Sequence, residues 1–429
     1  MSPGARRGGR RASAACAVLT CLALLACQGT KPTGPSASPA PPTGTAASPL
    51  VAPSGAAGVS LGPSPAPATP VPTLTPTLAE RLGLALRTLR GKDHLPGVQA
   101  VVSFGDGWTW AAHAGYANVS RETPVSNSSL FEAGSITKTF VAALTLELAD
   151  QGVLSLDDPL TRWLPDFPHA RGVTLRELLD HTSGLDDFFA HPTLLDRLGA
   201  EPRRAWTPAE VLRYVGAPHF APGRGYYYSN TNYVLLGQVI ERATGRSVAS
   251  LLRTRFFQPL GLDHTFLQSE EPVVGTPADG YGYAGPRDLS FQNLTDGSSY
   301  LPFTSLATAA GTAGSLVSTA SDLARWAVAL YGGRVLPPAA LAQMEDVAPT
   351  ARYRPPKPYG LGVERLAFGP LVSWGHDGRL SGYRAAMRYF PAQNLTIVVM
   401  TNIDGPDPDS IVAGLLKTLY PASAGRQAH

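Results

Sequence analysis

The spacing of hydrophobic and polar positions changes along the chain and predicts several elements. Leucine and alanine recur every three or four residues from 78 to 89, which predicts an amphipathic helix, and Thr77 with Glu80 forms the capping-box pattern at its start. Two apolar runs follow at 98–104 and 108–114, and the Gly-Asp-Gly sequence between them is typical of a β-hairpin.

Helical periodicity dominates the middle of the chain, from residue 135 to about 272, with further capping-box patterns at 174–177 and 207–210. Strand patterns return near the C-terminus, at 371–374, 384–390 and 395–401, before a last helix near 411–419. Strands at both ends that enclose helices predict an α/β fold, in which an antiparallel sheet flanked by helices carries an inserted, mainly helical domain. We assign the α/β domain to 77–134 and 290–421, and the helical domain to 135–289.

Composition separates the region before these elements from the rest. Residues 28–76 contain 13 of the chain's 40 prolines, one charged residue, Lys31, and no aromatic residue. Such a stretch buries too little apolar surface to offset the entropy of ordering. We therefore expect 27–76 to be an extended, partly polyproline tether.

The first 26 residues have the pattern of an export signal, because four arginines between 6 and 11 precede a charge-free run from 12 to 26. The 15-residue run is short for a membrane span of about 20 residues, although an uncleaved anchor helix is an alternative. Leu24-Leu25-Ala26-Cys27 resembles a lipobox, which implies an acylated Cys27 as the mature N-terminus; ordinary cleavage is the other alternative. We expect an exported, lipid-anchored protein at the periplasmic face or the cell surface.

The net charge and the positions of the cysteines exclude several functions for the folded part of the chain. The formal charge of the 429-residue chain is +3, and without the four arginines of the signal it becomes −1, so no nucleic-acid partner is implied. The three cysteines, Cys16, Cys21 and Cys27, all lie in the signal or at its end, which leaves no disulfide, thiolate nucleophile or cysteine metal site downstream. No histidine spacing resembles a zinc site, and we expect neither a metal nor a cofactor.

Three short motifs carry candidate chemistry. Ser135 and Lys138 lie three apart at the start of a helix-compatible run, so they share a face, and a lysine whose pKa is lowered by burial could take the serine proton. Because the chain has 31 serines and five lysines, chance can also produce this spacing. Tyr228 and Asn230 lie in a turn before a helix, where they could relay a proton and hold a substrate amide, or simply belong to an aromatic loop packed on the core.

The third motif, 376–378, follows a predicted strand, where backbone N–H groups could face an oxyanion; alone, it could be a turn with a surface histidine. Together the motifs resemble the serine β-lactamase and DD-peptidase superfamily, in its class C-like branch of D-alanyl-D-alanine carboxypeptidases, esterases and lactamases. The resemblance covers about 340 residues and includes the runs 178–185, 311–319 and 359–362.

The resemblance implies an acyl-enzyme mechanism in which Ser135 attacks a carbonyl and Lys138 and Tyr228 share the general-base work. It also implies an oxyanion hole made by the backbone N–H groups of Ser135 and Arg379. The remaining substrate-binding positions that it implies are Asn230, His376 and Gly378, of which Asn230 would hold the acyl-side amide and His376 stands where many relatives have lysine.

Two acids depart from the carboxypeptidase pattern. Asp377 stands where the resemblance implies a hydroxyl, and Glu364 where it implies an arginine; Arg365, one residue on, would face the other side of a strand. Both acids should repel a substrate carboxylate. We therefore expect poor activity on free D-Ala-D-Ala termini and penicillins, and better activity on neutral esters, amides or substrates with an amine.

Three functions remain open at this stage: a monomeric serine hydrolase that cleaves a small-molecule or peptide ester or amide, a true β-lactamase, and a non-catalytic penicillin-binding sensor. A pure binder has no need of Lys138 and Tyr228 beside Ser135, which argues against the sensor. Other polar residues have structural explanations: we expect His181 to order its loop, and Asp186 and Asp187 to be caps or solvated acids.

Overall fold

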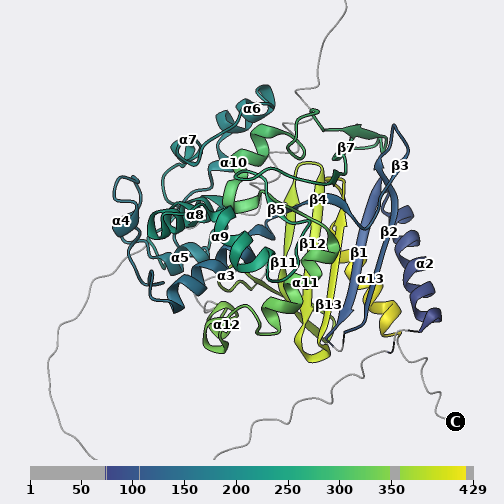
Figure 1. Ribbon diagram of the computed structural model, residues 1–429. Helices are drawn as coiled ribbons and strands as arrows, with labels where there is room; N and C mark the ends of the chain where they lie inside the picture. The colour runs from purple at the N-terminus through teal and green to yellow at the C-terminus, as the bar shows by residue number, and fades with distance from the viewer. Residues whose placement is uncertain (1–72, 74, 106, 348–357, 422–429) are drawn as a thin grey trace, which may run out of the picture.

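A seven-stranded antiparallel sheet with helices on both faces forms the frame of the molecule (Figure 1). The computed structural model describes residues 73, 75–105, 107–347 and 358–421. The predicted signal, the tether up to residue 72 and the lipidation site Cys27 lie outside the described residues. None of the helices within them has both the length and the apolar character needed to cross a bilayer.

The strands of the main sheet run in the order β10-β11-β12-β13-β1-β2-β3. Their bounds are β1 (Gly97–Phe104), β2 (Thr109–Asn118), β3 (Thr123–Pro124), β10 (Glu364–Phe368), β11 (Leu371–Leu380), β12 (Tyr383–Phe390) and β13 (Leu395–Thr401). A smaller sheet contains β5 (Phe266–Leu267), β9 (Leu316–Ser318), β4 (Ser129–Gly134) and β6 (Thr276–Pro277), and a hairpin contains β7 (Tyr281–Tyr283) and β8 (Phe291–Asn293).

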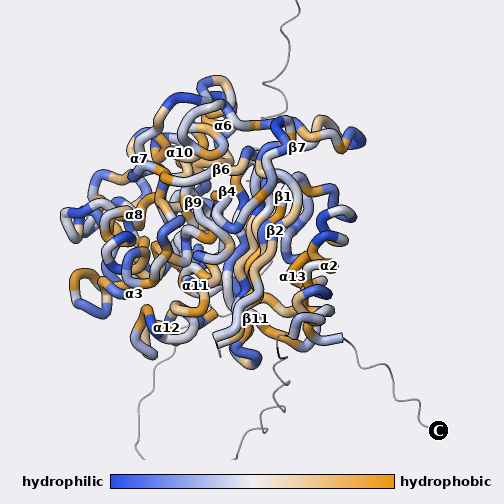
Figure 2. Tube along the Cα trace, turned by 45° about the vertical axis from the view of Figure 1, so that its right-hand side comes forward, coloured by the Kyte–Doolittle hydropathy of each residue, from blue (hydrophilic) through white to orange (hydrophobic). Residues whose placement is uncertain are grey.

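Two helices from opposite ends of the described chain, α2 (Pro76–Lys92) and α13 (Asp409–Leu419), pack together on one face of the main sheet. The other face carries α11 (Ala320–Tyr331) and the helical part. Every residue of β1 is buried, because alternate side chains enter the two cores. The hydrophobic stretches accordingly gather in the strands and between the helices, and the most hydrophilic stretches lie in peripheral loops (Figure 2).

The helical part surrounds α3 (Thr137–Asp150), which is buried around most of its circumference. Its other helices are α4 (Leu160–Trp163), α5 (Leu175–Leu179), α6 (Pro192–Ala200), α7 (Pro208–Val211), α8 (Asn230–Thr244), α9 (Val248–Leu252), α10 (Thr304–Gly314) and α12 (Pro338–Met344). Short turns of other helix types are η1 (Phe188–Ala190), η2 (Leu212–Tyr214), η3 (Arg253–Phe257) and η4 (Pro391–Gln393). Although α10 falls in the range 290–421, it packs against α3, α6, α7 and α8.

The predicted fold class is confirmed, and two local predictions are wrong. The first helix begins at Pro76, with the Thr75 hydroxyl accepting from the Leu78 N–H, so the predicted capping box at Thr77 does not form. Proline at the first helical position has no N–H to leave unpaired, which favours this earlier start. The third motif lies inside β11 rather than after it, because pairing with β12 continues to Leu380.

Candidate active site

The end of β4 lies very close to β11, and glycines make this approach possible. A Cβ added to Gly378 would lie 1.9 Å from the carbonyl oxygen of Ala133, and one added to Gly134 would lie 2.5 Å from the backbone nitrogen of Arg379. Gly134 also has φ +52°, in the region that glycine tolerates best. The Arg379 N–H is thereby placed next to the residue that precedes Ser135.

Lys138 joins the first two motifs. It lies in the first turn of α3, three residues after Ser135, and its side chain is fully buried. Its Nζ donates to Ser135 Oγ at 3.0 Å, to Asn230 Oδ1 at 2.8 Å and to the carbonyl oxygen of Ala313 at 2.8 Å. The serine and the lysine therefore form the contact that their spacing predicted.

Burial lowers the pKa of Lys138 from 10.5 to about 7, against the opposing effect of the negative charges of Asp187, Asp377 and Glu364. Near neutral pH both the amine and the ammonium are therefore populated. The amine can accept the proton of the Ser135 hydroxyl, and the resulting ammonium can return a proton later.

Tyr228 lies on the same serine and is held by its aromatic neighbours. Its side chain makes a hydrogen bond with Ser135, and its ring lies 4.3 Å from the ring of His181, centroid to centroid. Burial raises the pKa of Tyr228 well above 10, although its hydrogen bond with Ser135 acts in the opposite direction. The phenol is therefore protonated at neutral pH, and Lys138 is the stronger candidate for the first proton acceptor.

His181 orders the loop that carries Tyr228, in agreement with its expected structural role. Its Nδ1 lies 3.2 Å from the backbone N–H of Ser229, which donates to it, and 3.1 Å from Asn232 Nδ2. Burial, followed by the charge of Lys138, lowers the pKa of His181 well below 6.5, so the ring is neutral. It supports Tyr228 by packing and hydrogen bonding.

Asn230 is the first residue of α8, and the structure engages both ends of its amide. Oδ1 accepts from Lys138, and Nδ2 donates to Asp187 Oδ2 at 2.9 Å. Asp187 also caps η1 by accepting from the Phe189 N–H, which agrees with the expected cap. Sequence reasoning missed its second contact, because nothing in the local pattern connects residues 43 positions apart.

His376 is buried inside β11, which excludes the alternative of a surface histidine. Its Nε2 lies 2.9 Å from the hydroxyl of Tyr359, and its Nδ1 pairs with the backbone carbonyl of Asp377. Burial lowers the pKa of His376, and its ring packs edge-on to Tyr359. Tyr359 is thus a further member of this cluster, which the sequence analysis noted only as part of the run 359–362.

The two acids of the third motif region have different environments. Glu364 is buried against Arg388, whose Nη1 lies 2.8 Å from its carboxylate. Arg388 also binds Asp409, at 2.9 and 2.7 Å. The expectation of two acids facing a substrate did not anticipate this counter-charge. The Asp377 side chain is 38% exposed, and it lies 3.7 Å from His376 Nδ1.

Arg379 turns its guanidinium to Asp404, with contacts of 2.8 and 3.0 Å. Its backbone N–H, near Gly134, is therefore the group that matches the expected role at this position.

Among the described residues, Glu364, His376 and Asp377 are close enough to be considered as metal ligands. Both ring nitrogens of His376 are hydrogen-bonded and Glu364 is paired with Arg388, so the cluster does not fit a metal ion.

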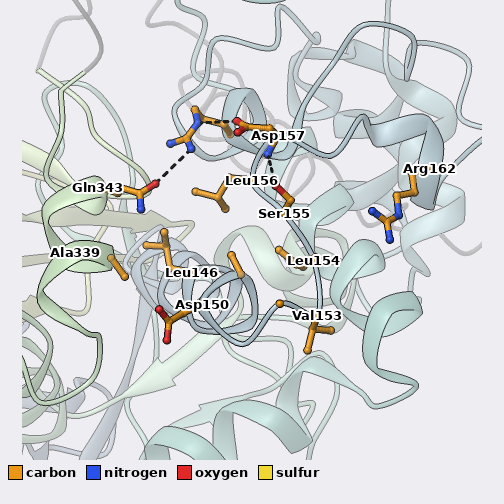
Figure 3. A pocket seen from close by; sticks show the side chains of 14 residues that line it. Leu146, Asp150, Val153, Leu154, Ser155, Leu156, Asp157, Arg162, Ala339 and Gln343 are labelled. Atoms are coloured by element: carbon orange, nitrogen blue, oxygen red, sulfur yellow. Dashed lines mark hydrogen bonds and ion pairs between the residues drawn. The ribbon is translucent and has the colours of Figure 1, made fainter.

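A cavity of about 510 Å³ lies away from this site, at the C-terminal end of α3 (Figure 3). Leu146, Leu154 and Gln343 line it, together with two arginines that are paired with neighbouring acids. Ser135 precedes the opposite end of the same helix, so the cavity is separate from the serine.

Comparisons with known proteins agree with the geometry. A family model described as Beta-lactamase matches residues 84–420. Penicillin-binding protein 4* of Bacillus subtilis (strain 168) is 30% identical over 307 residues, which are 67% of this chain and 64% of that protein. D-aminopeptidase of Gluconobacter oxydans (strain 621H) is 30% identical over 334 residues, which are 77% of this chain and 60% of that protein.

The solved structure of D-amino acid amidase from Ochrobactrum anthropi SV3, complexed with L-phenylalanine amide, has a TM-score of 0.69 and 27% identity. The match covers 80% of this chain and 98% of that chain. By contrast, the chain spans less than two thirds of the length of the two relatives compared by sequence.

Proposed function

The chain belongs to the beta-lactamase family, within the serine β-lactamase and DD-peptidase superfamily, and on that premise we propose that it is a serine hydrolase. It cleaves an ester or an amide through an acyl-Ser135 intermediate. The observation that carries this proposal is the contact of Ser135 Oγ with Lys138 Nζ at 3.0 Å, together with a Lys138 pKa of about 7. A serine beside an amine that is partly neutral at pH 7 is an activated nucleophile.

The proposed reaction has two steps that use the same groups. Ser135 Oγ attacks the carbonyl carbon while its proton passes to the Lys138 amine, directly or through Tyr228. The backbone N–H groups of Ser135 and Arg379 stabilise the oxyanion, and the leaving amine or alcohol departs with a proton from Lys138 or Tyr228. Water then attacks the carbonyl carbon of the acyl-serine and gives a proton to Lys138 or Tyr228. The bond between Ser135 Oγ and the acyl carbon breaks, Ser135 Oγ takes up that proton, and the carboxylic acid product leaves.

We propose that the substrate carries an amine near the scissile bond. We take the carboxylate of Asp377, whose side chain is 38% exposed, as the acid that distinguishes substrates, whereas Glu364 is buried against Arg388. A carboxylate favours an ammonium group and disfavours a second carboxylate. The names of the D-aminopeptidase and D-amino acid amidase relatives support an amino acid amide or a short peptide as substrate.

We also propose that the protein acts outside the cytoplasm, attached to a membrane through an acylated Cys27. The pattern of the first 27 residues supports this location.

A serine-reactive phosphonate probe and a substrate panel test the proposed function. Mass spectrometry of labelled protein should find the adduct on Ser135, and Ser135→Ala should abolish both labelling and hydrolysis. Amino acid amides should be cleaved at least tenfold faster than their N-acetylated forms, and Asp377→Asn should reduce that ratio. A label elsewhere, or none, would contradict the nucleophile assignment.

The same panel separates the alternatives. Rapid turnover of nitrocefin would identify a true β-lactamase. Labelling of Ser135 without turnover of any ester or amide would identify a sensor.

A further inference from the structure

Asp187 is a buried acid whose two oxygens have different partners. Its side chain is almost fully enclosed, with 2% of the residue exposed. Oδ1 accepts from the backbone N–H of Phe189 at 3.1 Å, and Oδ2 accepts from Asn230 Nδ2 at 2.9 Å. An ionised carboxylate has only acceptors, so it binds the nitrogen of an amide and never the oxygen.

This polarity determines which end of the Asn230 amide faces Lys138. Because Asp187 holds the nitrogen, the oxygen points to Lys138 Nζ at 2.8 Å. If the amide turned over, an N–H group would face the ammonium, and two donors would oppose each other without an acceptor. The orientation of Asn230 therefore depends on a residue that does not itself contact Ser135 in the described contacts.

The loop that carries Asp187 is fixed to the start of α8 on both sides of the carboxylate. The hydroxyls of Ser229 and Thr231 donate to the carbonyl of Asp186 at 3.1 and 2.6 Å. The Phe188 N–H in turn donates to the Thr231 hydroxyl at 3.2 Å. These bonds keep the distance between Asp187 and Asn230 short.

We propose that Asp187 is a positioning residue of the active site: it locks the Asn230 amide with its oxygen toward Lys138 and supplies the negative charge behind that amide. The contacts Asp187–Asn230, Asn230–Lys138 and Lys138–Ser135 form a continuous chain from a buried acid to the nucleophile. Asp187 thereby acts on the nucleophile through Lys138.

The charges around Lys138 show what the acid adds. Burial lowers the pKa of Lys138, and among the acids that raise it Asp187 has the largest effect, ahead of Asp377 and Glu364. The other titratable groups near Lys138 are neutral at pH 7, because burial lowers the pKa of His181 and His376 and raises that of Tyr228 and Tyr233. Asp187 itself has a pKa raised to about 6 by burial, so its negative charge predominates at pH 7 and above.

This inference rests on the proposed function. Its test is the pH dependence of kcat/KM for the hydrolysis of an amino acid ester. Asp187→Asn keeps the shape, removes the charge and leaves a single acceptor oxygen for the donors of Phe189 and Asn230. Without the charge the pKa of Lys138 falls further, so the rising limb of the pH profile should move by about half a unit or more to lower pH. The plateau kcat should fall about tenfold, because Asn230 is no longer held in one orientation.

Asp186→Asn is the matched control. Asp186 is the neighbouring acid of the same loop, but its carboxylate binds His219 and the N–H of Gly216. This variant should leave the rising limb of the pH profile and the plateau kcat unchanged. If the rising limb of the pH profile of Asp187→Asn coincided with that of the wild type, the inference would be overturned.

Two further measurements keep the result clear if Asp187→Asn folds poorly or has no activity. Asp187→Ser retains a side-chain acceptor that can cap η1, as serine does at N-caps, while it removes the charge. NMR titration of labelled lysine should place the pKa of Lys138 near 7 in the wild type and lower in Asp187→Ser.

Equal Lys138 pKa values in the wild type and Asp187→Ser would also overturn the inference. A wild-type protein without any Ser135 labelling or hydrolysis would instead contradict the proposed function.

Discussion

Lys138 can exist in both protonation states because two opposing features meet at its amine. Three oxygens lie within hydrogen-bond distance of Nζ, enough to accept all three protons of an ammonium group. Burial favours the neutral amine, the negative charges of Asp187, Asp377 and Glu364 favour the ammonium group, and the pKa lies at about 7. A group that gains and loses a proton near the ambient pH can serve both the attack by Ser135 and the departure of the leaving group.

Tyr228→Phe tests whether the phenol takes part in this proton transfer. The substitution removes the hydroxyl that bonds to Ser135, whereas the ring can keep its packing on His181. We expect kcat/KM to fall by about 10²- to 10⁴-fold, the range for loss of a general acid–base group, with little change in melting temperature. Steady-state kinetics and thermal unfolding of the same preparation measure both quantities.

Tyr226→Phe is the control for this substitution, because Tyr226 belongs to the same aromatic cluster beside His181 and Tyr359. It should retain most of the activity. If Tyr228→Phe stayed within a few-fold of the wild type, Lys138 would be sufficient as the proton acceptor.

The close approach of β4 and β11 is the property of the elements that creates the proposed oxyanion site. Gly378→Ala would place a methyl group 1.9 Å from the Ala133 carbonyl, so the strands must separate. We expect kcat to fall by about 10²-fold or more, as for loss of one oxyanion donor, together with a lower melting temperature. Gly91→Ala in α2 is the control, because its added Cβ meets nothing within 4 Å, and it should leave kcat unchanged.

Elements whose signals are local could be predicted from the sequence. The strand at 395–401 and the capping boxes at Thr174 and Thr207 have the predicted positions, since a short apolar run and a capping pair are properties of a few neighbouring residues. The length of β11 could not be predicted in this way. The second half of β11, from Gly375 to Leu380, contains two glycines and several polar residues, so no apolar run marks it as a strand. Its length depends on the pairing with β12, which a local pattern does not show.

The same distinction applies to the site. The serine–lysine contact follows from helical spacing, so the sequence could predict it. The pairing of Glu364 with Arg388, and that of Asp187 with Asn230, join different elements, and no local pattern identifies such partners. Buried charges acquire their partners only when the chain is folded, which is why the sequence identified Glu364 as an acid but missed its counter-charge.

At the scale of the whole molecule, the two terminal helices and the site lie on different sides of the main sheet. The pair α2 and α13 covers one face, and Ser135 precedes α3 in the helical part that packs on the other (Figure 1). A chain attached ahead of Pro76 therefore joins the molecule on the face opposite the helical part. If residues 28–75 form a polyproline-like tether, these 48 residues would reach up to about 150 Å, so attachment to a membrane would leave the site free to meet diffusing substrates.

Cys27→Ala tests how the protein is attached. If Cys27 is acylated, the wild type should be found in the membrane fraction and incorporate labelled palmitate, because a diacylated N-terminus gives stable anchoring. The variant should lose the label, while its activity per molecule should stay unchanged because residue 27 lies 49 positions ahead of Pro76, where α2 begins. Membrane fractionation with an activity assay measures both.

An uncleaved anchor helix would instead keep Cys27→Ala in the membrane, and ordinary signal cleavage would already leave the wild type in the soluble fraction; either result would contradict lipid attachment.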